Sequence, residues 1–277
     1  MALLGLACTE VPSVHGDDLS TASTTGGPPS TGEDEDEPAD PDGGEDTGQG
    51  MFDGVVGLLL DPTGQPLPDS DVLCCTSVTC YKGETEDDGA FSFTLDPGWE
   101  VAVKTHEELF ETPRWAAALV PSVTTESGVD VGVVYIPDLP AGVEIGDESE
   151  DPQTLGIGDG LELTFNRGDL IPDLGVFLYD FAARRIPDAY VPAYAALGSE
   201  TVVAVYAIHP FATVSTSPVV VRAPSTLPAG TVVNFRTINH FDGVFTSPVS
   251  GTSDGSFVTT DPGDGISLLT YLVISTP

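Results

Sequence analysis

Basic side chains are scarce in this sequence of 277 residues. It has 8 Lys and Arg residues against 44 Asp and Glu residues, which gives a formal net charge of -36 at pH 7. Proteins that bind nucleic acids neutralise phosphates with clustered Lys and Arg, and proteins that dock electrostatically onto anionic lipid use the same residues. The composition therefore excludes a phosphate-driven nucleic-acid partner and argues against electrostatic docking to lipid.

The residue patterns of membrane spans and of common active sites are also missing. No segment has 18 uninterrupted apolar residues, so the sequence predicts no transmembrane helix. The four histidines, His15, His106, His209 and His240, do not have the spacing of metal ligands, and Lys82 and Lys104 are the only lysines. We predict that the chain is not an enzyme, with no catalytic residue, metal site or cofactor.

Glycine and proline, by contrast, are plentiful. The 31 Gly and 24 Pro residues, together with many Val, Thr and Asp residues, favour strands joined by turns over long helices. Apolar residues still make up 40% of the chain, which is enough for a buried core. The composition therefore predicts an all-β protein.

The N-terminal residues 1–8 form a short apolar run that ends in Leu6-Ala7-Cys8. This run resembles the end of a bacterial lipoprotein signal peptide, in which the cysteine becomes the lipidated first residue. The positively charged region is missing and seven residues are few for the apolar part, so we expect the true start to lie upstream. The resemblance implies a lipid anchor at Cys8. The alternative is an ordinary N-terminus with a chance cysteine.

Residues 9–51 form a second distinct segment, rich in Thr, Ser, Gly, Pro and acidic residues. Residues 1–50 hold 12 acidic residues and no Lys or Arg, and few large apolar side chains follow Val14. Such a segment cannot bury enough apolar surface to offset its ordering entropy, so we expect a disordered linker. Following a lipidated Cys8, it would be a tether that lifts the folded part off a membrane. The alternative is an acidic tail without function.

The segment 52–137 reads as a first β-sandwich. Residues 54–60, 71–75, 80–85, 90–95, 100–104 and 129–136 have the patterns of strands, with turns at 61–68 and 87–89. The run from Asp61 to Pro68, followed by Val72 and by Glu84 to Phe93, resembles the carboxypeptidase regulatory-like, transthyretin-like β-sandwich. That resemblance implies a non-catalytic accessory module of secreted and envelope proteins. Residues 106–128 are longer than the family pattern, and we expect a short helix or an extended loop there.

Three cysteines of this segment lie within seven residues, at Cys74, Cys75 and Cys80. One cluster without a second Cys or His pair is weak evidence for zinc. A local disulfide must involve Cys80, because a bridge between neighbours is strained. We favour Cys75–Cys80, which leaves Cys74 pointing into the core, although Cys74–Cys80 stays open. The alternative is three reduced, buried thiols.

The segment 138–277 reads as a second β-sandwich. Strand patterns cover residues 161–165, 175–179, 201–208, 219–221, 231–235 and 268–274, and an exposed acidic loop is expected at 147–152. The runs from Ser217 to Val233, Asn239 to Phe245 and Ser253 to Phe257 are similar to the β-sandwich shared by zonula occludens proteins, netrin receptors and ankyrins. The resemblance implies an interaction surface and carries no binding residue across.

Three further features each have a functional and a structural interpretation. Four aromatic residues could stack on sugar rings or pack in the core and at sheet edges: Trp99, Trp115, Tyr190 and Tyr194. The Asp/Gly-rich turns 87–89 and 261–265 could bind Ca²⁺, but neither has the EF-hand order, and plain turns are favoured. The pair Arg184-Arg185 could meet an acidic partner, but ion pairs within the chain are favoured.

The sequence thus predicts two β-sandwich domains, immunoglobulin-like or transthyretin-like, that follow a disordered acidic linker. Its predicted function is that of a non-enzymatic lipoprotein of the cell envelope, with the outer membrane favoured, facing the periplasm or the exterior. The membrane is the partner of the lipid anchor, and a glycan or protein is the expected ligand at the surface. The alternative is a secreted carbohydrate-binding accessory protein.

Overall fold

The computed structural model describes residues 54–76, 78–105, 115–125, 128–173, 178–191, 199–240 and 243–277. The chain divides into two compact units, 1–50 and 51–277, and every described residue belongs to the second unit. The predicted signal segment 1–8, with Cys8, and the predicted linker 9–51 lie outside the described residues. Among the described residues, no helix has the length and apolar character needed to cross a bilayer.

The predicted all-β fold class is confirmed for the described residues, in which the helical elements are short 3-10 turns. These turns are η1 (Glu148–Glu150), η2 (Arg167–Asp169) and η3 (Asp188–Tyr190). The strands are β1 (Gly54–Leu60), β2 (Asp71–Cys75), β3 (Cys80–Glu84), β4 (Ala90–Thr94), β5 (Glu100–Lys104), β6 (Leu119–Thr124), β7 (Val129–Tyr135), β8 (Val143–Glu144), β9 (Gln153–Gly158), β10 (Leu161–Phe165), β11 (Leu170–Ile171), β12 (Asp180–Arg185), β13 (Thr201–His209), β14 (Thr213–Pro224), β15 (Val232–Thr237), β16 (Val249–Ser253), β17 (Phe257–Thr260), β18 (Ile266–Leu269) and β19 (Tyr271–Thr276).

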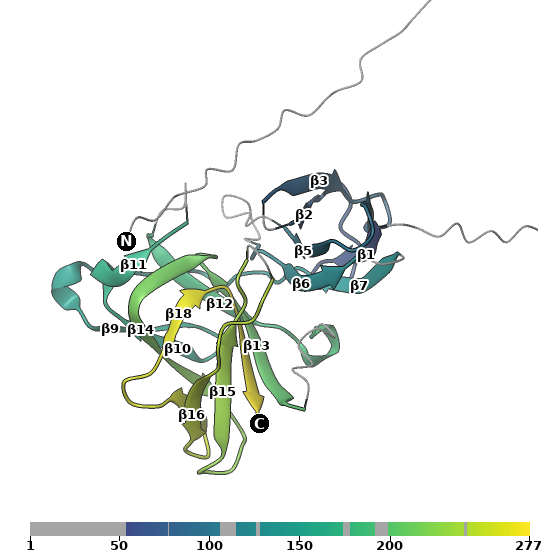
Figure 1. Cartoon of the computed structure of the whole chain (residues 1–277). Helices are drawn as coiled ribbons and strands as arrows, with labels where there is room; N and C mark the ends of the chain where they lie inside the picture. Colours follow the sequence, from purple (N-terminus) through teal and green to yellow (C-terminus); the bar gives the residue numbers. More distant parts are fainter. Residues whose placement is uncertain are drawn as a thin grey trace, which may run out of the picture. The chain divides into compact units, whose positions relative to one another are not determined.

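Strands β1 to β7 form two sheets that share one core, which we call the N-terminal sandwich (Figure 1). One sheet has the order β4-β1-β7 and the other has the order β3-β2-β5-β6. Alternation places Phe91 and Phe93 of β4 in the core while Ser92 is exposed, and the opposite sheet contributes Val101 and Val103 of β5. The strands β3 and β6 are the edges of the four-stranded sheet.

Strands β8 to β19 form the C-terminal body, a 12-stranded hydrogen-bonded arrangement around a second core. Its main path runs β8-β12-β13-β19-β15-β16-β17-β14-β10-β9. The path bends round, since β9 and β12 are in contact. Strand β14 is the longest described strand: residues 214–215 pair with β11, residues 220–224 pair with β10 and β17, and β18 pairs before and after Pro218. The pairing with β18 is irregular between Val214 and Val219, the segment that contains Pro218.

Parts of β12, β13 and β19 are buried on both faces, which explains the continuous apolar runs of β13 and β19. In β13, Tyr206 and Ile208 point into the body's own core, whereas Val205 and Ala207 join a separate buried cluster. That cluster, here called the junction cluster, combines residues of β12, β13 and β19 with residues of the N-terminal sandwich such as Leu119. Both groups of strands are therefore packed within one compact unit.

Some predicted strands are wrong in extent. The single strand predicted at 268–274 is two strands, β18 and β19, separated at Thr270, whose buried hydroxyl bonds both the N–H and the carbonyl of Ile238. Residues 106–128 were predicted to form a short helix or an extended loop, but Leu119–Thr124 form the strand β6. Residues 106–114 lie outside the described residues. In the predicted strand 175–179, the last two residues are not in a strand and the others are not described. The domain boundary at 137/138 stays a prediction.

Candidate functional site

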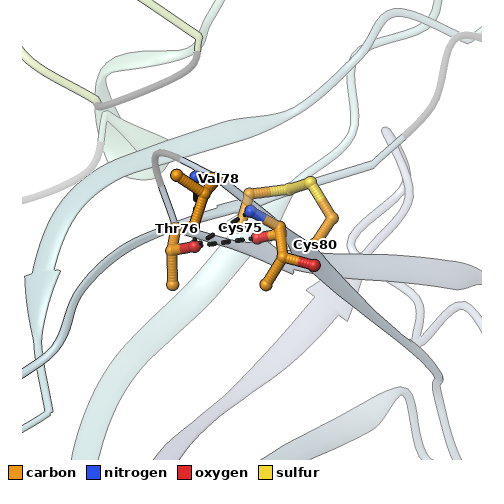
Figure 2. The surroundings of a disulfide bond; sticks show 5 residues. Cys75, Thr76, Val78 and Cys80 are labelled. Carbon is orange, nitrogen blue, oxygen red and sulfur yellow. Dashed lines mark hydrogen bonds between the residues drawn. A yellow bond between two sulfur atoms is a disulfide. The ribbon is translucent and has the colours of Figure 1, made fainter. Parts of the chain in front are cut away.

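A disulfide joins Cys75 and Cys80 across the hairpin of β2 and β3, as Figure 2 shows. The two residues are register partners in adjacent antiparallel strands, and their Cα atoms are 3.9 Å apart. In the connecting turn, the hydroxyl of Thr76 accepts hydrogen bonds from the N–H groups of Val78 and Thr79 at 3.3 and 3.1 Å. The predicted Cys75–Cys80 pairing is confirmed, and the bridge fixes the start of the edge strand β3.

Cys74, the remaining cysteine of the cluster, is buried in the core of the N-terminal sandwich as predicted. Burial raises the pKa of its thiol to about 12, because the thiolate would lose its hydration there. Its register partner across the ladder is Tyr81, so both side chains point toward the same face of the sheet. Cys74 thus fills the core while Tyr81, on the edge strand, stays 39% exposed.

An open cleft of about 280 Å³ lies beside Tyr81 at this edge of the sandwich. It is lined by Tyr81, Thr94, Leu95, Asp96, Pro97 and Trp99. The rings of Tyr81 and Trp99 have centroids 6.0 Å apart and planes tilted by 32°. Trp99 is half-buried, and its side chain packs against the core of the N-terminal sandwich. A second hollow, at the junction cluster, has about 10 Å³.

The loop that carries Asp96 and Trp99 is fixed by a single buried residue, Thr125. The Thr125 hydroxyl donates to the Asp96 carbonyl at 2.7 Å and accepts the Trp99 N–H at 3.0 Å. Its backbone N–H donates to the Trp99 carbonyl at 2.9 Å, and its carbonyl accepts the N–H of Gly98 at 2.6 Å. Gly98 has φ of +85°, a conformation that favours glycine. The cleft therefore has a preformed wall.

Two of the other aromatic residues singled out in the sequence, Trp115 and Tyr190, have packing contacts. Trp115 is half-buried and packs against the core of the N-terminal sandwich, and its backbone forms an isolated antiparallel β-bridge with Asp138. Tyr190 stacks on Tyr135, with ring centroids 4.7 Å apart and planes within 5°. Tyr194 lies outside the described residues. Of the four aromatic residues singled out in the sequence, Trp99 lines an open cleft.

The basic pair Arg184-Arg185 forms ion pairs within the chain, as favoured above. Arg184 donates to the carbonyl and the carboxylate of Asp138 at 2.8 and 3.1 Å, and to the carboxylate of Asp159 at 3.3 Å. Arg185 pairs with Asp188 at 3.1 Å. Asp138 follows the last strand of the N-terminal sandwich, so Arg184 links the two groups of sheets.

The described histidines are buried near the junction cluster. His209 is 2% exposed, and its Nε2 lies 3.3 Å from a carboxylate oxygen of Asp180. The ring of His240 meets that of Phe211 edge to face. His15 and His106 lie outside the described residues. No group of three or more potential metal-ligating side chains occurs in the described ranges.

The acidic turns bind their own backbone. In the turn 87–89, the Asp88 carboxylate accepts the N–H of Ala90 at 3.0 Å. In the turn 261–265, the Asp261 carbonyl accepts the N–H of Asp264 at 2.9 Å, and the Asp261 carboxylate accepts the hydroxyl of Thr252 in β16 at 3.2 Å. These contacts fit the interpretation as plain turns.

Sequence reasoning passed over one motif. Residues 251–255 have the order Gly-x-Ser-x-Gly of a nucleophile elbow, which requires a strand-to-helix turn. Here they end β16 and enter the hairpin to β17, and Ser253 is buried. The Ser253 hydroxyl donates to the carbonyl of Leu227 at 2.9 Å and accepts the N–H of Gly255 at 3.1 Å. Ser253 therefore ties a loop to the hairpin.

Comparison with known proteins finds no family model that matches the chain and no curated relative. The resemblances to the carboxypeptidase regulatory-like module and to the zonula occludens, netrin receptor and ankyrin module stay predictions. The β-sandwich architecture itself is what the sheets show.

Proposed function

We propose that this chain is a non-enzymatic lipoprotein of the cell envelope, a binding or structural module at the surface. In this proposal Cys8 carries the lipid, residues 9–51 are the acidic tether, and the β-strands from Gly54 onward form the folded part. The N-terminal sandwich would be a carboxypeptidase regulatory-like module, and the C-terminal body would belong with the zonula occludens, netrin receptor and ankyrin modules.

The observation that carries the proposal is the Cys75–Cys80 disulfide. Structural disulfides form and persist in oxidising compartments, such as the periplasm and the cell surface. A disulfide on an edge hairpin supports a place outside the cytoplasm, which is where a lipidated Cys8 would hold the protein. The outer membrane is the favoured site of attachment.

Metabolic labelling with a fatty-acid analogue tests the anchor. The protein is expressed from its own genomic locus, as wild type, Cys8→Ala and Cys74→Ala. We expect wild type and Cys74→Ala to carry label and to sediment with membranes, and Cys8→Ala to lose both properties. A Cys8→Ala protein that keeps the label and stays membrane-bound would refute lipidation at Cys8.

A second candidate function is that of a secreted carbohydrate-binding accessory protein. The observation that favours it is the pair of partly exposed rings at the cleft, Tyr81 and Trp99. It predicts a soluble protein that carries no lipid and binds glycans. The two candidates differ in the labelling experiment, and both are compatible with a glycan ligand.

A further inference from the structure

We propose that the cleft lined by Tyr81 and Trp99 binds a sugar ring of a neutral polysaccharide. This inference rests on the proposed function in one respect, since it takes the folded part to be a binding module. It names the site and the chemical class of the ligand, and it assigns Thr125 as a positioning residue.

The first argument is the aromatic surface. The Tyr81 side chain stands at the edge strand β3, where no further strand of the sheet covers it. Trp99 lines the same cleft and lies next to Tyr81, with its ring centroid 6.0 Å from that of Tyr81. The faces of aromatic rings are electron-rich, and they attract the positively polarised C–H groups on the flat side of a pyranose. Two such rings on a fixed wall form a platform for stacking.

The second argument is the set of polar groups around these rings. The Trp99 indole N–H, the Tyr81 hydroxyl and the Asp96 carboxylate have no hydrogen-bond or ion-pair partner among the residues that the structure describes. Trp99 supplies a donor, Tyr81 supplies both a donor and an acceptor, and Asp96 supplies an acceptor. Sugar hydroxyls both donate and accept, so a sugar satisfies all three groups. A cationic ligand offers no acceptor, so the Tyr81 O–H and the Trp99 N–H would have no hydrogen-bond partner in the complex.

The third argument is charge and size. Exposed Asp96 lines the cleft, exposed Glu100 follows Trp99 directly, and the whole chain carries a net charge of -36. Anionic sugars, such as uronic acids and sulfated glycans, would be repelled. The cleft of about 280 Å³ lies near the lower end of ligand-pocket volumes, ~300–1,000 Å³, which suits one ring of a longer chain that continues into solvent.

The fourth argument is preorganisation. Thr125 is 1% exposed and bonds both Asp96 and Trp99, so the loop has its conformation before any ligand arrives. The disulfide fixes the other wall, because Tyr81 directly follows Cys80. A cleft whose walls are held in place loses little conformational entropy on binding.

The test uses the two tryptophans of the chain, Trp99 and Trp115. In the full chain with Trp115→Phe, Trp99 is the only tryptophan, so its emission reports the cleft alone. A matched Trp99→Phe chain keeps Trp115 as a reporter placed elsewhere. Both are titrated with a soluble β-glucan, a mannan, chitohexaose, dextran sulfate and tetramethylammonium chloride. We expect at least one neutral sugar to change Trp99 emission and to leave Trp115 emission unchanged.

Affinity electrophoresis with the same polymers measures the contribution of each residue. We expect Trp99→Ala and Tyr81→Ala each to weaken binding by about tenfold. Tyr179→Ala is the matched control, because Tyr179 is also an exposed tyrosine but lies far along the chain and outside the cleft lining. Thr125→Val is expected to weaken binding as Trp99→Ala does, and Thr125→Ser, which keeps the hydroxyl, to restore it.

Two results would overturn the inference. One is no response of Trp99 to any of the neutral sugars, and the other is a response confined to tetramethylammonium or to dextran sulfate. The labelling experiment at Cys8 stays independent of both. Sugar binding without lipid labelling would favour the secreted accessory protein, whereas labelling without sugar binding would remove this inference and leave the lipoprotein proposal in place.

Discussion

The N-terminal sandwich and the C-terminal body enclose their hydrophobic cores in different ways. In the C-terminal body, one hydrogen-bonded path of strands bends around its core, and Phe181, Phe235 and Leu272 are fully buried there. The N-terminal sandwich has two short sheets, and its edge strand β3 is largely exposed. A small core stabilises less than a large one, and a disulfide supplements it. The less enclosed part of the molecule therefore contains both the disulfide and the candidate binding cleft.

The two parts are nevertheless joined by a buried contact. Leu119 and Tyr135 of the N-terminal sandwich share the junction cluster with Tyr271 and Val273 of β19. Burial raises the pKa of the Tyr271 phenol, and a hydrogen bond with the Leu119 backbone lowers it in part. We therefore expect the stability of each part to depend on the other.

The largest effect is expected from the core of the C-terminal body. Phe235→Ala should lower the free energy of unfolding by about 3–5 kcal/mol, because the ring is fully buried and packs against Gly251. Urea unfolding is followed by far-ultraviolet circular dichroism and by tryptophan fluorescence. Trp99 and Trp115 both pack against the N-terminal sandwich, so their signal reports that part.

If the junction cluster couples the two parts, Phe235→Ala shifts the circular dichroism and the fluorescence transitions together. A fluorescence transition that keeps its midpoint would show that the N-terminal sandwich unfolds independently. Phe91→Ala, in the core of the N-terminal sandwich, is the reciprocal variant.

The second effect concerns the disulfide. Replacing Cys75 and Cys80 by Ser should destabilise the N-terminal sandwich by about 2 kcal/mol, the chain-entropy value for so short a loop. The readout is alkylation of Cys74 by iodoacetamide in a Cys8→Ser background, where Cys74 is the only free thiol. Because its thiol is buried and its pKa is raised to about 12, Cys74 reacts after unfolding.

We expect the rate of Cys74 alkylation to rise by about 30-fold when the disulfide is removed, which is 2 kcal/mol expressed as an equilibrium ratio. Cys74→Ala in the same background is the blank. An unchanged rate would mean that the disulfide contributes nothing to the stability of this part.

The third effect depends on pH and belongs to the C-terminal body. Glu200 accepts hydrogen bonds from Ser275 at 2.6 Å and from Arg236 at 2.7 Å. The hydrogen bond from Ser275, followed by that from Arg236, lowers the pKa of the Glu200 carboxyl. The unfolded chain therefore binds this proton more readily than the folded chain. The stabilisation is present above 4.5, the ordinary pKa of a glutamate carboxyl, and is lost as pH falls through the pKa of the folded state.

Glu200→Gln should thus lower the free energy of unfolding by about 1.5 kcal/mol at pH 7, with the difference shrinking below pH ~4.5. Glu162→Gln is the matched control, since the side chains of Glu162 and Arg222 are 37% and 35% exposed, more than those of Glu200 and Arg236, and their pair should contribute about 0.5 kcal/mol. A Glu200→Gln difference that is the same at pH 3 and pH 7 would contradict this assignment.

The smallest effect is expected at the stacked pair Tyr135 and Tyr190, which spans the junction. A double-mutant cycle with Tyr135→Leu and Tyr190→Leu should give a coupling energy of about 0.5–1 kcal/mol. Leu keeps an apolar side chain, so the cycle isolates the contact between rings. A coupling energy of zero would leave the ion pairs of Arg184 and the junction cluster as the contacts that join the two parts.

Sequence reasoning found the strands whose side chains alternate between a core and solvent. Strand β10 is an example, in which Leu161, Leu163 and Phe165 are buried and the residues between them are not. Strand β6 was missed because it contains Pro121, which an edge strand tolerates but a local pattern does not indicate. Strand β9 was missed because Gly156 and Gly158 weaken its pattern.

Only part of the candidate site could be predicted from the sequence. Trp99 was singled out by its residue type, but Tyr81 was not, because nothing local shows that β3 is the edge of its sheet. The role of Thr125 was equally hidden, since it acts on residues 26 and 29 positions away. Contacts of this kind depend on the order of the strands, which a single sequence leaves open.

The position of β19 in the path has a consequence for the order in which the parts of the chain fold. Residues Tyr271–Thr276 lie between β13 and β15, in the interior of the C-terminal body, and they supply both its core and the junction cluster. The strands of the N-terminal sandwich are all present once Tyr135 has emerged from the ribosome or from the export channel, so that part can form its sheets first. The C-terminal body must wait for its last strand, and a nascent chain that stops before Tyr271 would display the unclosed seam to cellular proteases.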